Sequence, residues 1–194
     1  LAATLAEGKT IIRPAAQEPE VDDLIAFLCE MGAAVERTAP DTIEIEGRKR
    51  LRGAQHAVVP DRIEAGTFIV AAAVTGGRNT LQGAPCDHLG AFVETLGRVG
   101  VGVSCGTDTI EVDGSALHAG GYRGLDIETA PYPGLATDLQ PPTAVLLTQA
   151  TGVSRVHETI FEDRLEWLAE VRRMGGAVEL PDPHHAIISG PSKL

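Results

Sequence analysis

The sequence predicts an α/β fold of repeated βαβαββ units, an inside-out arrangement with buried helices and outer sheets. Three observations support this prediction. Glycines recur at matching places along the chain, the hydrophobic period changes from helical to strand-like within each repeat, and some helical stretches are apolar on nearly every side. Aromatic residues make up only 4% of the chain, which is expected where small side chains let buried helices approach closely.

The repeat is visible in three segments with the same order of features. They are DLIAFLCEMGAAVERTAPDTIEIEG (23–47), DHLGAFVETLGRVGVGVSCGTDTIEVDG (87–114) and DRLEWLAEVRRMGGAVELPDPHHAIISG (163–190). Each holds two glycines that are 15, 14 and 15 residues apart, and a further glycine lies 24, 23 and 23 residues before the first of them. These glycines are Gly32 and Gly47, Gly100 and Gly114, Gly175 and Gly190, preceded by Gly8, Gly77 and Gly152. The chain thus advances by 69 and then 75 residues per unit, which indicates an internal repeat.

Each repeated segment predicts one amphipathic helix, because its apolar residues recur at i, i+3, i+4 and i+7. These stripes comprise Leu24, Ile25, Phe27, Leu28 and Met31; Leu89, Phe92, Val93, Leu96 and Val99; and Trp167, Leu168, Val171 and Met174. The glycine after each stripe suits a left-handed helix end. Two other helices, 64–74 and 140–150, are apolar on nearly all sides and are therefore predicted to be buried.

The predicted strands alternate with these helices. Stretches 9–13, 79–82 and 154–160 come between the helices of a unit, and stretches 55–59 and 126–129 precede the two apolar helices. Residues 1–6 have the character of the tail of a helix, and the chain has no initiator Met. We therefore expect a piece of a longer protein.

Charge and cysteine content narrow the class of protein. Lys and Arg number 16 against 27 Asp and Glu, for a net charge of −11. This balance argues against a nucleic-acid-binding protein and against a protein that binds membranes through a polybasic surface. A few local basic groups would still be enough to bind an anionic substrate. The longest apolar run, 68–74, is too short to span a membrane. Three cysteines without a CxxC pair predict a reducing, cytoplasmic compartment.

Polar residues stand at the junctions that lead into helices. Asp61 and Arg62 precede the first apolar helix, and Asp138 precedes the second. Glu18 and Glu20 occupy the matching place in the first unit. These residues fit two interpretations: helix caps favoured by the dipole, or the polar rim of a cleft, because helix N-termini are natural anion sites.

Arg164 ends the segment HETIFEDR (157–164) at the predicted start of the last helix. A cation there is unfavourable for the helix dipole, so Arg164 is expected to face an anion. That anion is either a nearby Asp or Glu, or the phosphate or carboxylate of a ligand. His184 and His185 lie between prolines in a predicted turn and are expected to be solvated. No metal-ligand spacing and no Walker or Rossmann phosphate loop is present.

Several stretches carry a resemblance to a known family. They are EPEVDDLIAFLCEMGA, TDTIEIEG, VPDRIEAGTFIVAAAVTGG, APYPGLATDLQ and HETIFEDRLEWLAEVRRMGG. Across nearly the whole chain they resemble the UDP-N-acetylglucosamine 1-carboxyvinyltransferase family of enolpyruvyl transferases, and they resemble the shikimate-pathway enolpyruvyl transferases much less. The resemblance implies two similar domains, each an α/β prism of three βαβαββ units. Residues 1–52 then form the last unit of one domain, truncated at its start. Residues 53–122 and 123–194 form the first and next units of the other.

The resemblance also implies an activity. Such enzymes transfer enolpyruvyl from phosphoenolpyruvate to the 3-hydroxyl of UDP-N-acetylglucosamine and release phosphate, with no metal or organic cofactor. This is the first committed step of peptidoglycan precursor synthesis. The implied partners are these two substrates and the remainder of the same polypeptide, and the fragment alone is expected to be inactive. Two alternatives remain open: a paralogous enzyme such as the shikimate-pathway type, and a non-catalytic repeat module used for binding.

Residue by residue, the resemblance assigns roles. Asp138 matches the family aspartate that contacts the acceptor hydroxyl and is the candidate base, here in ATD rather than PTD. Ile160 matches a backbone contact to the nucleotide sugar, and Arg164 matches an arginine near phosphoenolpyruvate. Four further residues match polar positions that line the interdomain cleft: Asp61, Arg62, Glu18 and Glu20. The family's N-terminal Lys-Asn pair and its loop with a reactive Cys or Asp have no counterpart in this chain.

Overall fold

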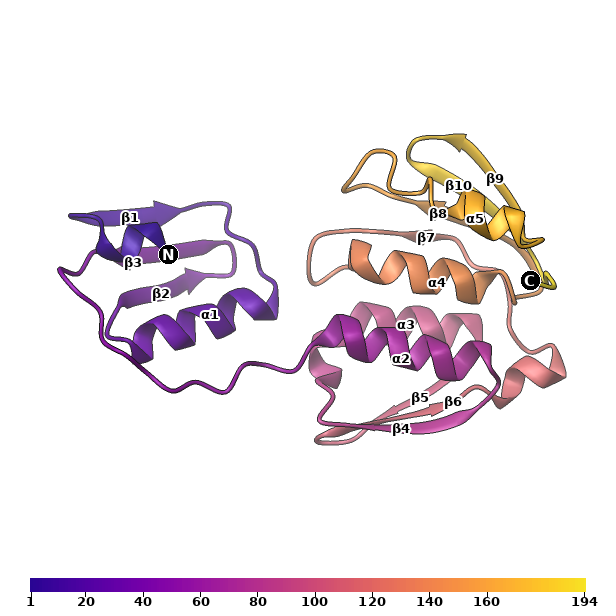
Figure 1. Ribbon diagram of the computed structural model, residues 1–194, viewed down its shortest axis with the longest axis horizontal. Helices are drawn as coiled ribbons and strands as arrows, with labels where there is room; N and C mark the ends of the chain where they lie inside the picture. The colour runs from indigo at the N-terminus through magenta and orange to yellow at the C-terminus, as the bar shows by residue number, and fades with distance from the viewer. The chain divides into compact units, whose positions relative to one another are not determined.

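A computed structural model describes residues 1–194, which divide into two units, Leu1–Val59 and Pro60–Leu194 (Figure 1). The strands form three sheets with the orders β1-β3-β2, β4-β6-β5 and β7-β8-β10-β9. In each sheet the strand that comes last in the sequence lies between two earlier ones and pairs antiparallel with both. The same topology thus occurs three times, and the predicted repeating α/β fold is confirmed.

Unit 1 is one helix packed on one sheet. Its elements are the 3₁₀ helix η1 (Ala2–Leu5), β1 (Lys9–Ile12), α1 (Pro19–Glu30), β2 (Ala34–Ala39) and β3 (Thr42–Glu46). In β3, Ile43 and Ile45 are buried and their neighbours are less so, which is the alternation expected of a strand with one face on a core. Leu28 of α1 packs against this face. The rest of the predicted stripe is only half-buried, and Leu24 is exposed, because a single sheet covers one side of the helix.

Unit 2 contains the other two repeats. The first comprises α2 (Arg62–Val74), β4 (Arg78–Gln82), η2 (Cys86–Leu89), α3 (Gly90–Val99), β5 (Gly102–Cys105), β6 (Thr109–Asp113) and η3 (Ser115–Ala119). The second comprises β7 (Ile127–Glu128), η4 (Thr137–Leu139), α4 (Gln140–Leu147), β8 (Gly152–His157), α5 (Leu168–Arg173), β9 (Ala177–Asp182) and β10 (His185–Gly190). β7 pairs parallel with β8 and adds a fourth strand to the sheet of this second repeat.

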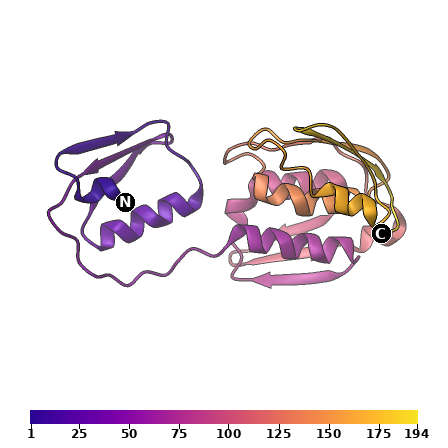
Figure 2. The same ribbon diagram turned by 45° about the horizontal axis from the view of Figure 1, so that its top comes forward.

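The helices of unit 2 lie between its two sheets (Figures 1 and 2). Ile69 of α2 and Leu146 of α4 are fully buried, so the predicted burial of these two helices is confirmed for the faces that carry them. Gly66 permits the close approach, because a Cβ there would lie 2.5 Å from a methyl carbon of Leu139. One side of α2 differs from the expectation, since Phe68 is 58% exposed.

A buried tyrosine joins α2 to the end of β6. The Tyr122 hydroxyl lies 3.0 Å from the carbonyl oxygen of Ala73 and 3.1 Å from that of Gly114, and its one proton is shared between them. Burial raises the pKa of Tyr122, so it remains a donor at neutral pH. At Gly114 a Cβ would lie 2.8 Å from the Ala72 carbonyl oxygen. The contact between helix and strand at this point therefore requires glycine.

Two expectations from the sequence are wrong or lose their basis. Residues 55–59 form no strand. Val58 is 77% exposed, and the stretch lies against α1 of unit 1 instead of joining a sheet. Cys86 and Cys105 form a disulfide with a Cα–Cα distance of 5.9 Å, while Cys29 is free. The cysteine pattern therefore gives no support to a reducing compartment. No helix of the structure combines the length and apolar character needed to cross a bilayer.

A histidine holds the stretch 55–59 against α1. His56 Nε2 lies 2.8 Å from Asp23 Oδ1, and its Nδ1 lies 3.3 Å from Glu30 Oε1. The ring also stacks on Phe27 at 5.3 Å, and the Val59 N–H donates to Asp23 at 3.2 Å. Hydrogen bonds to Asp23 and then to Glu30 raise the pKa of His56 above 6.5. The imidazolium is thus the form that these contacts favour.

We expect Gly114→Ala to destabilise the protein and Gly97→Ala to stabilise it. The first places a methyl group against backbone atoms that cannot move aside, with an expected loss of about 1–3 kcal/mol. The second adds a methyl group to an exposed helical position with nothing within 4 Å, with an expected gain of about 0.5–1 kcal/mol. Urea unfolding monitored by circular dichroism measures both, and equal effects would contradict the close contact at Gly114.

The His56 contacts predict that the 55–59 stretch is held more firmly at low pH. Because the folded pKa is raised, the added stability is complete below the unfolded pKa near 6.5 and is lost as pH rises through the folded pKa. Amide exchange of 55–59, corrected for its intrinsic rate, should therefore be slower at pH 6 than at pH 8. His56→Gln should remove the difference, and His118→Gln in unit 2 should not. A difference that survives in His56→Gln would refute the assignment.

Candidate functional site

Three predicted site residues of unit 2, Asp61, Arg62 and Asp138, lie where α2 and α4 begin, at the left end of this unit in Figure 1. Ile160 and Arg164 lie between β8 and α5. Asp61 caps α2, since its Oδ1 accepts hydrogen bonds from the N–H groups of Ile63 (2.8 Å) and Glu64 (3.0 Å). Arg62 is buried, at 7% exposure, and its guanidinium lies 5.5 Å from the ring centre of Tyr132. The capping interpretation is thus correct for Asp61.

The structure brings Asp138 and Arg164 together. Asp138 lies in η4 and makes no capping hydrogen bond to α4, contrary to the simplest expectation from the sequence. Its Oδ1 instead accepts a hydrogen bond of 2.5 Å from the Arg164 guanidinium. Arg164 lies in the turns before α5, not at a helix start, and its guanidinium is 5.2 Å from the ring centre of Phe161. Asp138 is the anion that faces Arg164.

This ion pair is open to solvent and has binding capacity left. The side chains of Asp138 and Arg164 are 57% and 32% exposed. A guanidinium carries five N–H donors in a planar fork, and the bond to Asp138 uses one nitrogen of Arg164. The other donors suit the carboxylate or phosphate of a ligand. The pair therefore combines a proton acceptor with an anion-binding group.

Glu158 was not among the residues that the sequence singles out. It directly follows β8 and is fully buried, at 0% exposure. Its Oε1 accepts from the Thr129 hydroxyl and the Ile160 N–H, both at 2.9 Å, and its Oε2 accepts from the Thr137 hydroxyl at 2.8 Å. In the sequence, Glu158 is one of several acidic residues in a charged segment. The one signal of its role is that Glu158 and Thr129 each directly follow one of two paired strands, β8 and β7.

Ile160 lies in the loop that this carboxylate holds. The residue is 37% exposed, and its N–H is taken by Glu158. Its carbonyl oxygen is then the backbone group left to meet a ligand donor. The main chain of Glu158 is fixed in turn by His184, whose carbonyl accepts the Glu158 N–H at 2.8 Å and whose Nδ1 lies 2.9 Å from the Glu158 carbonyl oxygen. His184 is thus a structural contact, contrary to its expected solvation.

The turn that carries His184 is itself held by a carboxylate. Asp182 Oδ1 accepts from the His184 N–H at 2.8 Å and lies 2.8 Å from His185 Nδ1. The bonds from His185 and then from the His184 backbone lower the pKa of Asp182. His185 also stacks on His157 at 4.4 Å. The backbone around Glu158 therefore rests on an ordered β9–β10 turn.

Glu18 and Glu20 belong to unit 1, at the start of α1. Glu18 holds the N-cap position, but its side chain makes no capping hydrogen bond. Glu20 lies in the first turn, where the helix dipole favours an acidic residue. Arg37 orders the preceding loop, because it donates to Asp22 at 2.6 Å and to the Ala16 carbonyl at 3.0 Å.

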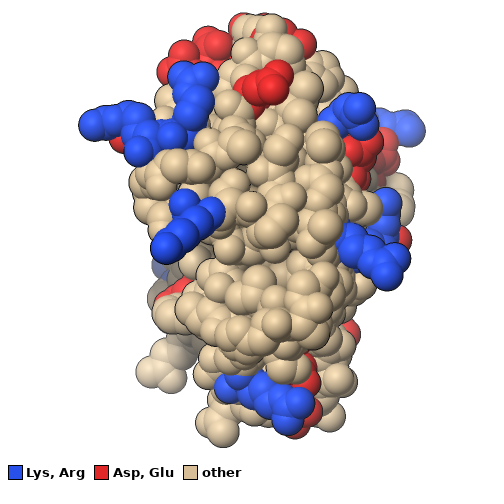
Figure 3. Space-filling model, turned by 90° about the vertical axis from the view of Figure 1, so that its right-hand side faces the viewer, with Lys and Arg blue, Asp and Glu red and all other residues tan.

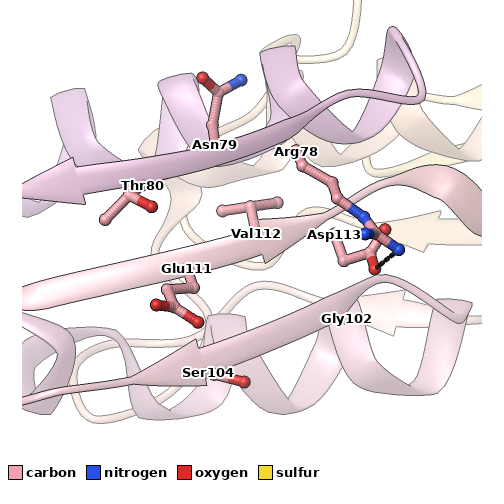
Figure 4. A pocket seen from close by; sticks show the side chains of 8 residues that line it. All are labelled: Arg78, Asn79, Thr80, Gly102, Ser104, Glu111, Val112 and Asp113. Carbon is pink, nitrogen blue, oxygen red and sulfur yellow. Dashed lines mark ion pairs between the residues drawn. The ribbon is translucent and has the colours of Figure 1, made fainter.

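Other parts of unit 2 offer less chemistry. A hollow on the outer face of the β4-β6-β5 sheet is lined mainly by polar side chains, and at one end Arg78 pairs with Asp113 at 3.0 Å (Figure 4). The bonds from Ser115 and from Arg78 lower the pKa of Asp113 to about 2. The end of the unit opposite the site has a largely uncharged centre, with both basic and acidic side chains toward its margins (Figure 3). No group of three or more His, Cys, Asp or Glu side chains is arranged to hold a metal ion.

Residues 1–194 match the family described as EPSP synthase (3-phosphoshikimate 1-carboxyvinyltransferase). The chain belongs to this family of enolpyruvyl transferases. This match confirms the membership of the enolpyruvyl transferase family that the sequence motifs predict. A UDP-N-acetylglucosamine 1-carboxyvinyltransferase of Solibacter usitatus is 45% identical over 195 residues, which cover all of this chain and 46% of the relative. An enzyme of the same name from Actinobacillus pleuropneumoniae serotype 3 is also 45% identical, over 45% of its length. The chain thus spans less than half of these relatives.

Solved structures of the family have the same fold. The enolpyruvyl transferase NikO from Streptomyces tendae matches with a TM-score of 0.84 and 25% identity, over 98% of this chain and 44% of that one. EPSP synthase from Acinetobacter baumannii matches with a TM-score of 0.70 and 22% identity, over 99% of this chain and 44% of that one. At that identity the second match concerns the fold alone.

The geometry predicts unequal contributions to stability from the two carboxylates of the site. Asp138→Asn should change the free energy of unfolding by less than about 1 kcal/mol, because exposed ion pairs contribute little. Glu158→Ala should cost about 2–4 kcal/mol, because it leaves a buried hydroxyl and a backbone N–H without an acceptor. Urea unfolding of both variants tests this. A loss for Asp138→Asn as large as that for Glu158→Ala would contradict it.

Proposed function

We propose that the protein containing this chain transfers enolpyruvyl from phosphoenolpyruvate to the 3-hydroxyl of UDP-N-acetylglucosamine and releases phosphate. The observation that carries the proposal is the contact between Asp138 and Arg164, which pairs a proton acceptor with an anion-binding group. The names of relatives that are 45% identical over the whole chain support the choice of substrates.

In the proposed reaction the acceptor hydroxyl oxygen bonds to C2 of phosphoenolpyruvate, and C3 gains a proton to become a methyl group. The hydroxyl proton passes to Asp138, because a carboxylate within hydrogen-bond reach is suited to accept it. Loss of phosphate and of a C3 proton then restores the double bond on the transferred group. Arg164 binds the carboxylate or phosphate of phosphoenolpyruvate beside that carboxylate. The group that protonates C3 lies outside this chain.

The other predicted residues take supporting roles in the proposal. The Ile160 carbonyl accepts a hydrogen bond from the nucleotide sugar, since its N–H is already used by Glu158. Asp61 and Arg62 of unit 2 are assigned to the substrate-binding residues of the full-length protein, and so are Glu18 and Glu20 of unit 1. The remainder of the same polypeptide supplies the missing units, with residues 1–52 in one domain and residues 53–122 and 123–194 in the other.

The biological setting follows from the substrates. The product is the first committed intermediate of peptidoglycan precursors, so the enzyme would serve cell-wall synthesis and thereby cell shape and division. A cytoplasmic site of action stays a prediction. The family description names 3-phosphoshikimate, so shikimate 3-phosphate is the second candidate acceptor. Phosphate release with each acceptor in turn decides between them, and release with neither would favour a non-catalytic binding module.

Asp138→Ala in the full-length protein should abolish phosphate release while UDP-N-acetylglucosamine binding survives at least in part. The carboxylate that accepts the hydroxyl proton is lost, whereas the Ile160 loop remains. Asp126→Ala is the matched control, because Asp126 also pairs with an arginine, Arg155, at 3.3 Å. It should leave turnover unchanged. Steady-state phosphate release and calorimetric binding measure both properties.

Unchanged turnover in Asp138→Ala would overturn the role given to that residue. The isolated 194-residue chain should show no turnover, because the proposed proton donor at C3 lies outside it. Phosphate release by the isolated chain would contradict that part of the proposal.

A further inference from the structure

Glu158 is a fully buried carboxylate that the proposed reaction does not use. Transfer of a carboxylate into a protein interior is costly unless its lone pairs are satisfied. Every donor that reaches the Glu158 side chain is a hydroxyl or a backbone N–H, and none is a basic side chain. The donors that satisfy this carboxylate belong to separate segments of the chain, so the carboxylate holds those segments together.

The two oxygens of Glu158 reach two different parts of the site. Oε2 accepts from the Thr137 hydroxyl at 2.8 Å, and Thr137 directly precedes Asp138. Oε1 accepts from the Ile160 N–H at 2.9 Å. One carboxylate therefore bridges the turn that carries the proposed base and the loop that presents the proposed backbone contact.

The bridge is anchored to the sheet. β7 and β8 run parallel with Glu128 opposite His157, so Thr129 and Glu158 follow at the same carboxyl end. Thr129 donates its hydroxyl to Glu158 Oε1 and accepts the Thr159 N–H at 2.9 Å, and the Thr159 hydroxyl donates to the Thr129 carbonyl at 2.6 Å. These paired bonds fix the direction in which the Glu158 side chain leaves the strand.

We propose that Glu158 is a positioning residue that sets Asp138 and the Ile160 carbonyl relative to each other. This inference rests on the proposed function, because it assigns those two groups to the acceptor substrate. The carboxylate suits the task because both its oxygens accept hydrogen bonds. A glutamine retains one such oxygen and presents an N–H₂ group in place of the other.

Replacements that remove one link at a time separate positioning from folding. Thr137→Val removes only the hydroxyl that joins Glu158 to the Asp138 turn. Glu158→Gln keeps an oxygen for Ile160 and Thr129 but alters the link to Thr137, and Glu158→Ala removes every link. Thr95→Val is the matched control, since the Thr95 hydroxyl donates to the Ala91 carbonyl at 2.8 Å inside α3.

In the full-length protein, Thr137→Val should lower kcat by about tenfold and leave the KM for UDP-N-acetylglucosamine within about twofold, since small misplacements of a reacting group are costly. Glu158→Ala should lower kcat and also raise that KM. Glu158→Gln should restore the KM toward the wild-type value while kcat stays low. Thr95→Val should change neither constant, although its melting temperature falls.

Wild-type kcat and KM in both Thr137→Val and Glu158→Gln, with melting temperatures lowered as in Thr95→Val, would overturn the positioning role. A readout without substrate separates this failure from failure of the proposed function. Amide exchange of Ile160 should be slow in the wild type and at least about tenfold faster in Glu158→Ala, as expected when a buried acceptor is lost. An inactive wild-type protein with this exchange pattern refutes the substrates, whereas an active one without it refutes the role of Glu158.

Discussion

The structure of unit 2 depends on how closely its helices approach one another between two sheets. α2 and α4 are buried over most of their surface, apart from the side of α2 that carries Phe68, and small residues occupy the closest contacts. Gly66 lies against Leu139, and Gly114 lies against the backbone of α2. This constraint explains the low aromatic content of the chain better than any property of the sheets. It also fixes the positions of both helix starts, and the site is built on those starts.

The starts of α2 and α4 place two aspartates, Asp61 and Asp138, at one end of the unit. Asp61 satisfies the first N–H groups of α2, whereas α4 begins after a 3₁₀ turn and needs no such cap from Asp138. The Asp138 side chain therefore makes no capping hydrogen bond and instead accepts a hydrogen bond from Arg164. The two helix starts thus use the same residue type differently: one aspartate serves the fold, and the other remains open to solvent.

The repeat, the buried helices and the Asp61 cap follow from the sequence because each depends on local spacing. The strand expected at 55–59 does not form, because a β-prone pattern needs a neighbouring strand and His56 ties this stretch to α1. The sequence does not identify the partner of Arg164, because Asp138 lies 26 residues away. It does not identify Glu158 for the same reason, since contacts from Thr129 and Thr137 create its burial. Sequence patterns describe neighbours along the chain, whereas the site is made by residues that folding brings together.

The shared strand order of the three sheets governs when each sheet can form during synthesis. In every case the middle strand is the last to be made: β3, β6 and β10 each pair with two strands that precede them. Until that strand leaves the ribosome, its two partners have no antiparallel neighbour, and the helix between them has no complete surface to cover. Each repeat therefore completes its sheet only when the strand at its C-terminal end is made. A nascent chain that stops short of β10 lacks the strand that joins β8 to β9, so the loop that begins at Glu158 is among the last parts of the chain to gain its full support.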